Sequence, residues 1–186
     1  MSAPLAWPDP PLADDVIHLR PPAERDLEMV RAASDDPYIP LITTVPWVYT
    51  GAEGAAWLAR QHDRVASGAG WPLVVAERAG GRAVGTVGLW PRDATAAALG
   101  YFVIPEARGR GLASRAVRLL AGWAFRRGFE RLEVTVEPWN AASLRTAERA
   151  GFRREALMRS LMEFGGVRRD LVMLSRLAAD PPPAAR

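Results

Sequence analysis

Two arginines and two glycines alternate between an apolar segment and a predicted helix that runs to about Arg127. They are Arg108, Gly109, Arg110 and Gly111. Glycine lets the backbone approach a ligand closely, and the amides of a helix's first turn have no partner within the helix. These amides, the positive end of the helix dipole and the two guanidiniums predict a binding site for an anion, most naturally a phosphate. The alternative is a plain strand-to-helix turn with solvated arginines.

Two common nucleotide-binding motifs fit this loop poorly. A P-loop ends in Gly-Lys-Ser or Gly-Lys-Thr, and this chain contains no lysine. A dinucleotide-binding fingerprint needs a third glycine, where Ser114 stands, and Glu137 is only a late candidate for the acid that binds the ribose. A ligand with a phosphate group would therefore be bound here by a loop of a different type from these two.

The elements on both sides of the loop must position it. Residues 99–104 are apolar and aromatic, as in a strand that is buried on both faces. Pro105 ends that strand because proline cannot donate to a ladder. The helix after the loop stops at Gly128, which suits the position just beyond a helix C-terminus.

The rest of the chain predicts a mixed α/β domain. The predicted strands are 16–20, 72–78, 83–90, 95–104, 131–137, 152–163 and 167–177. The predicted helices, apart from the one after the loop, are 21–33, 50–67 and 140–149, and residues 35–46 are irregular. This order predicts a mixed, mostly antiparallel sheet of about seven strands with flanking helices. Residues 15–178 form one predicted domain, with a loose segment over 1–14 and a disordered tail over 179–186.

Several motifs together resemble the GCN5-related N-acetyltransferase (GNAT) superfamily. Arg108-Gly-Arg-Gly-Leu-Ala113 is similar to the loop Arg/Gln-x-x-Gly-x-Gly/Ala that holds the pyrophosphate of acetyl-CoA in that family. The similarity continues through Trp123-Ala-Phe125, Arg131-Leu-Glu133, Asn140-Ala-Ala-Ser143 and Ala150-Gly-Phe152. The combination looks like the branch that acetylates the N-termini of ribosomal proteins, and it covers residues from about 83 to 177.

The resemblance implies the GNAT fold and acetyl-CoA as the cofactor. In that fold, the strand before the loop splays from its neighbour and pairs its backbone with the pantetheine arm. Asn140 is the only asparagine of the chain, and the resemblance implies that it contacts the cofactor, although asparagine also suits a helix N-cap. The implied cofactor-binding residues are Tyr101, Phe102, Val103, Arg108, Gly109, Arg110, Gly111, Leu112, Ala113, Ser114, Asn140 and Ser143.

Acetyl transfer to an amine requires that the amine lose a proton and that the departing thiolate gain one. The resemblance places the Ser143 hydroxyl near the CoA sulfur. Many relatives have a tyrosine near Ala147 as the general acid, and its absence here gives the acid role to Ser143. Glu163 resembles a glutamate that is the base in the N-terminal-acetylating branch. The alternatives are that Glu163 is a solvated carboxylate beside a hairpin and that an ordered water is the base.

The predicted reaction is direct transfer of an acetyl group from acetyl-CoA to a primary amine in a ternary complex. A protein N-terminal α-amine, with a pKa of about 8, or a small-molecule amine is favoured over a lysine side chain, with a pKa of about 10.4. The alternative is a non-catalytic CoA-binding sensor or interaction module. It is suggested by the three alanines at 96–98, on a strand where relatives often carry a glutamate.

The amino-acid composition disfavours several kinds of cofactor and partner. The chain has no cysteine and only two histidines, His18 and His62, so no disulfide framework and no metal centre are predicted. The net charge is only +3, and arginines alternate with acids, which does not favour nucleic acid as a partner. No segment of the sequence is long enough to span a membrane, and no signal peptide is recognised. These features predict a cytoplasmic monomer or homodimer.

Overall fold

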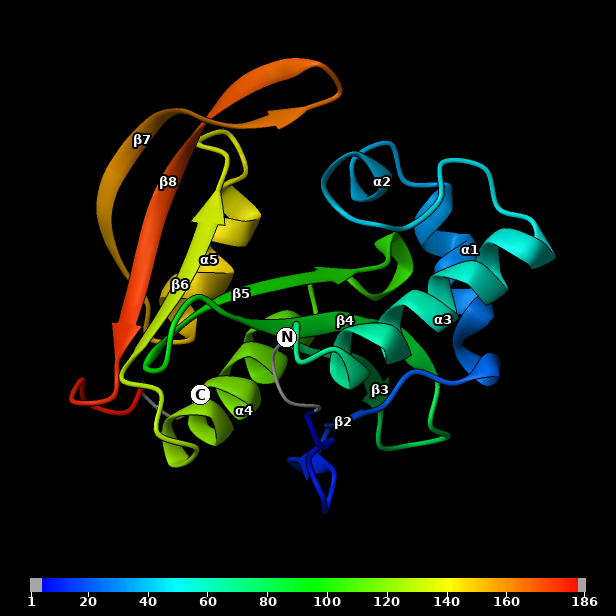
Figure 1. The fold of residues 1–186 in the computed structure, drawn as a ribbon, viewed down its shortest axis with the longest axis horizontal. Coiled ribbons are helices and arrows are strands. Elements are labelled where there is room, and N and C mark those ends of the chain that lie inside the picture. Colours follow the sequence, from blue (N-terminus) through cyan, green and yellow to red (C-terminus); the bar gives the residue numbers. More distant parts are fainter. Residues whose placement is uncertain (1–4, 184–186) are drawn as a thin grey trace.

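A sheet of eight strands organises the protein, in the order β1-β2-β3-β4-β5-β6-β8-β7 (Figure 1). The computed structural model describes residues 5–183, so the ends of the predicted N-terminal segment and of the predicted tail lie outside it. The strands are β1 (Leu12–Ala13), β2 (Ile17–Arg20), β3 (Trp71–Glu77), β4 (Ala83–Pro91), β5 (Ala96–Val103), β6 (Arg131–Val136), β7 (Arg153–Phe164) and β8 (Val167–Leu177). All neighbours are antiparallel except β5 and β6, which confirms a mixed, mostly antiparallel α/β fold.

Within the described residues, five α-helices flank the sheet. They are α1 (Leu27–Ser34), α2 (Ile39–Ile42), α3 (Gly51–Ala66), α4 (Leu112–Arg126) and α5 (Ala141–Arg149), with 3-10 turns η1 (Glu24–Asp26) and η2 (Pro105–Ala107). Helices α4 and α5 cover one face of the sheet, and α1 and α3 cover the other (Figure 1). The Thr50 hydroxyl accepts a hydrogen bond from the Glu53 amide, so Thr50 caps the start of α3, where the sequence predicts a helix from residue 50.

The structure differs from the predicted order in two places. The eighth strand, β1, lies within the segment 1–14, where the sequence predicts loose chain. Leu5 and Trp7 of the same segment pack against the core, and the Trp71 indole donates to the Ala6 carbonyl at 2.8 Å. These are isolated apolar contacts without a periodic pattern, so the sequence does not reveal them. The short helix α2 lies within the segment 35–46, which the sequence predicts to be irregular.

Strands β5 and β6 separate soon after they meet. Residues 96–98 of β5 pair with residues 131–133 of β6, but β5 continues to Val103 and β6 to Val136. Strand β4 pairs with the other edge of β5, and β8 with the other edge of β6. Beyond residue 98, the facing backbone edges of β5 and β6 therefore have no strand partner within the described chain. This is the splay that the resemblance implies.

A buried ion pair joins β2 to the start of α1. Asp26 is only 1% exposed and accepts hydrogen bonds from Arg20 Nη1 at 2.7 Å and Arg20 Nη2 at 2.6 Å. The Ala23 amide donates to the same carboxylate at 2.9 Å. Removing one partner of a buried pair leaves the other charge desolvated and uncompensated.

Replacing Asp26 with alanine is therefore expected to lower the free energy of unfolding by about 3–5 kcal/mol. Urea denaturation measures this loss. The matched control is Glu148→Ala, which removes an exposed pair with Arg154 at 2.7 Å and is expected to cost about 0–1 kcal/mol. Equal losses in the two variants would show that the buried pair has no special role.

Candidate active site

The predicted anion-binding loop has the backbone geometry that the glycines suggested. Gly109 has a φ of 78° and Gly111 a φ of 74°, in the left-handed region that favours glycine. Gly111 is the N-cap of α4, and no side chain caps that helix. The Ser114 hydroxyl instead donates to the Gly111 carbonyl at 2.8 Å. The first-turn amides of α4 therefore stay available to an external acceptor.

The two loop arginines are tied to the protein by carboxylates. Arg108 Nη2 donates to Asp36 at 2.7 Å, and its Nε donates to the Val103 carbonyl at 3.0 Å. Arg110 Nη2 donates to Glu77 at 2.5 Å. Burial by itself would raise the pKa of Asp36, but hydrogen bonds from two backbone amides and from Arg108 lower it overall. The arginines thus brace the loop as well as adding positive charge, which differs from both sequence interpretations.

Two clefts meet at the splayed strands. We call the first the loop cleft: it has a volume of about 500 Å³ and lies between the loop, the start of α4 and α5. Every predicted cofactor-binding residue lines it except Arg110, which lies in a neighbouring groove. We call the second the sheet cleft: it has a volume of about 550 Å³ and extends over β4, β5 and β6 between α3 and the β7–β8 hairpin. The residues that line both clefts are Tyr38, Ile42, Tyr101, Phe102, Asn140 and Ser143.

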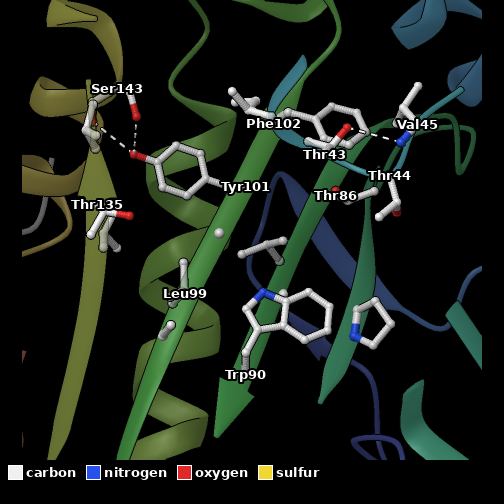
Figure 2. Close-up of a pocket in the computed structure, with 18 of the residues that line it drawn as sticks. Thr43, Thr44, Val45, Thr86, Trp90, Leu99, Tyr101, Phe102, Thr135 and Ser143 are labelled. Atoms are coloured by element: carbon white, nitrogen blue, oxygen red, sulfur yellow. Dashed lines mark hydrogen bonds between the residues drawn. The ribbon is translucent and has the colours of Figure 1, made fainter. Parts of the chain in front are cut away.

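Ser143 is held at the junction of the clefts. The Asn140 side chain accepts a hydrogen bond from the Ser143 amide at 3.0 Å, so Asn140 is the predicted N-cap of α5. The Tyr101 ring reaches from β5 toward Ser143, and its hydroxyl lies 2.9 Å from both the carbonyl oxygen and the hydroxyl of Ser143 (Figure 2). Burial raises the pKa of Tyr101 to about 12, so this phenol stays protonated at neutral pH. The sequence predicted a cofactor contact for Tyr101, but not this hydroxyl pair.

Glu163 lines neither of the two clefts that meet at Ser143. Its neighbours on β7, Met162 and Phe164, line the sheet cleft, whereas Glu163 is exposed and does not. Side chains alternate between the two faces of a strand, which explains the difference. Glu163 pairs in register with Arg168 of β8. The structure thus does not bring the two predicted catalytic side chains into one cleft.

Glu137 is the only acidic residue that lines the sheet cleft within the described part of the chain. It follows β6 directly and is 4% exposed. Its Oε2 accepts a hydrogen bond from the Tyr38 hydroxyl at 2.7 Å, and its Oε1 lies 3.9 Å from Arg169 Nε. Burial, together with the nearby Glu137 charge, raises the pKa of Tyr38, so that hydroxyl remains a donor. The sequence predicted Glu137 only as a late candidate for a ribose-binding acid and did not link it to Tyr38.

Solved structures that are similar to this fold include acetyltransferases. A putative ribosomal-protein-serine acetyltransferase from Vibrio cholerae aligns with a TM-score of 0.78 at 21% identity, covering 92% of this chain and 99% of that one. RimJ of Mycobacterium smegmatis, solved in complex with CoA-disulfide, aligns with a TM-score of 0.78 at 26% identity, covering 92% and 88%.

The chain belongs to the GNAT family, because the family model described as "Acetyltransferase (GNAT) domain" matches residues 17–153. The family predicted from the loop and its downstream motifs is thus confirmed. A probable N-acetyltransferase of Bacillus subtilis, YjcK, is 37% identical over 103 residues, which are 53% of this chain. That match spans only 57% of YjcK.

No helix within residues 5–183 has the length and apolar character needed to cross a membrane. No three side chains among His, Cys, Asp and Glu lie close enough together there to hold a metal ion.

Proposed function

We propose that the protein is an acetyl-CoA-dependent N-acetyltransferase that transfers the acetyl group directly to a primary amine. The favoured acceptors are a protein N-terminal α-amine and a small-molecule amine. The observation that carries the proposal is the junction at Ser143, where the loop cleft opens into a second cleft of similar size. A non-catalytic CoA-binding module would need only the first cleft.

The residues of the loop cleft suit CoA. The left-handed glycines Gly109 and Gly111 present the first-turn amides of α4 to a pyrophosphate. The unpaired edge of β5 offers backbone groups to the pantetheine arm, whatever the side chains are. When bound, acetyl-CoA supplies an acetyl group that is activated as a thioester. A metal or a covalent enzyme intermediate is not needed for this transfer.

Different residues at the junction carry out the two proton transfers of the reaction. As the new C–N bond forms and the C–S bond breaks, Ser143 donates its hydroxyl proton to the departing thiolate and takes a proton back from solvent water. Tyr101 orients that hydroxyl from 2.9 Å. Glu137 accepts the proton of the attacking amine, since it is the carboxylate that the sheet cleft offers. Glu163 remains the base that the resemblance favours. Holding the amine against the thioester supplies much of the remaining acceleration.

Ser143→Ala is expected to lower kcat by about tenfold to a thousandfold, as for the loss of one proton-transfer group. The lower end is favoured because the pKa of a simple thiol, about 8.5, makes the thiolate a fair leaving group. The affinity for CoA is expected to change little. Steady-state kinetics and calorimetric titration with CoA measure the two quantities. Unchanged kcat would remove Ser143 from the acid role.

The decisive experiment incubates the purified protein with labelled acetyl-CoA and a panel of amines, followed by mass spectrometry. The panel contains peptides with free N-termini, small amines and an Nα-blocked lysine. Label is expected on α-amines or small amines before lysine side chains, because more of the α-amine is neutral at pH 7. Label mainly on lysine would reverse the acceptor ranking. CoA binding without transfer to any amine would favour the non-catalytic module.

A further inference from the structure

One wall of the sheet cleft carries a half-buried arginine. Arg64, on α3, lines this cleft, and its guanidinium carbon lies 5.1 Å from the centre of the Trp90 ring. Arg64 Nη1 donates to Gln61 Oε1 at 2.6 Å, and its Nη2 lies 3.4 Å from the Thr44 hydroxyl. Gln61 is itself 3% exposed and is held by the Trp57 carbonyl at 2.9 Å. The guanidinium is therefore fixed in place by neutral groups.

Arg64 has no carboxylate within 4 Å among the described residues. In contrast, the loop arginines Arg108 and Arg110 each have an acidic partner. Burial, and then the charge of Arg60, lower the pKa of the Arg64 guanidinium, which is the cost of holding an unpaired cation there. Arg92 lines the same cleft and also has no acidic partner in the described chain. This end of the sheet cleft thus has positive charge without a counter-charge.

The position of Trp90 on the sheet indicates where Arg64 lies relative to the junction. The indole lies over Gly88, where an added Cβ would come within 2.5 Å of the ring (Figure 2 shows Trp90 on β4). Gly88 pairs with Gly100 of β5, two residues before Phe102, which lines both clefts. Two residues of a strand span about 7 Å. Arg64 and Trp90 line the sheet cleft but not the loop cleft, so the guanidinium lies apart from the junction where the amine reacts.

We propose that Arg64 binds an anionic group of the acceptor, a carboxylate or a phosphate that is separated from the reacting amine by several bonds. The planar fork of a guanidinium matches both anions through two parallel hydrogen bonds. Stacking on Trp90 occupies only the face of the guanidinium, and three of its five N–H donors are not used by Gln61 and Thr44. The inference rests on the proposed function and narrows its acceptors to amines with a distal anion. A dipeptide with a free C-terminus and an aminoalkyl phosphate have this form.

The test compares acceptors that differ only in the anion. Alanyl-alanine is paired with alanyl-alanine amide, and aminopropyl phosphate with aminopropanol, so that the preferred pair distinguishes carboxylate from phosphate. The wild-type protein is expected to favour one anionic member through a lower KM. Arg64→Gln is expected to raise that KM by about 10- to 100-fold, as for the loss of a hydrogen-bonded charge pair, with little change for the neutral member. Arg64→Lys is expected to restore part of the preference.

Arg60→Gln is the matched control. Arg60 lies one turn earlier on α3 and donates to the Thr44 carbonyl at 3.2 Å, but it does not line the sheet cleft. This variant should keep the preference for the anion. Equal effects of Arg64→Gln on the acid and the amide would indicate a purely structural arginine and overturn the proposal, as would a wild-type protein without preference.

The anion site can also be tested if the protein transfers no acetyl group. The acid and the amide are titrated into the CoA-bound protein by calorimetry, without turnover. Tighter binding of the acid that is lost in Arg64→Gln supports the anion site even if no acetyl transfer is seen, in which case only the proposed function fails. Equal affinities for the acid and the amide, or no binding of either, contradict the anion site.

Discussion

Gly111→Val is expected to weaken CoA binding by about 100-fold or more. Gly111 has a φ of 74° at the N-cap of α4, and a β-branched residue does not adopt that conformation without strain. The backbone must rotate, which turns the first-turn amides away from the phosphate. Each lost hydrogen bond to a charged group costs about 1.5–3 kcal/mol, so one or two suffice for this loss. Calorimetric titration with CoA measures it.

The control for Gly111→Val is Gly128→Val. Gly128 has a φ of 93° at the other end of α4, and nothing lies within 4 Å of an added Cβ there. Its replacement introduces comparable backbone strain without touching the loop. Thermal unfolding should show similar destabilisation of the two variants, whereas only Gly111→Val should lose CoA. Wild-type affinity in folded Gly111→Val would show that CoA does not bind on this loop.

Glu137→Gln is expected to lower kcat/KM by about 100- to 10,000-fold at neutral pH, the usual contribution of a general base. The glutamine keeps the shape and an acceptor for the Tyr38 hydroxyl, which lies 2.7 Å from the carboxylate, but it cannot accept a proton. The acidic limb of the kcat/KM profile should therefore disappear. Steady-state rates over a range of pH test this, with two acceptors of different amine pKa to separate the enzyme's titration from the acceptor's.

Glu163→Gln is the direct comparison. The exposed position of Glu163 on β7 predicts rates and a pH profile close to those of the wild-type protein. If Glu163→Gln loses the acidic limb and Glu137→Gln keeps it, the base suggested by the resemblance is correct and Glu137 only positions Tyr38. If both variants keep the limb with both acceptors, neither carboxylate is the base, and an ordered water accepts the proton.

The sequence by itself determined the features that depend on local backbone physics. Gly109 and Gly111 have the positive φ values that their spacing suggested, and Asn140 caps α5. Thr50 starts α3 as predicted. The alternation of apolar residues located the main strands to within a few positions. Such features involve residues fewer than about five positions apart, so the chain encodes them without knowledge of the fold.

The tertiary structure alone decided which polar side chains face the reaction centre. Glu137 meets Tyr38 across 99 positions of the chain, and Tyr101 meets Ser143 across 42. The face of Glu163 depends on the register of β7 against β8, which shifts by one residue between Arg154 and Ala156. A shift of one residue turns every later side chain to the other face of a strand, and sequence spacing does not record it. The splay of β5 from β6 then sets where these side chains meet, because strand order and register are properties of the whole sheet.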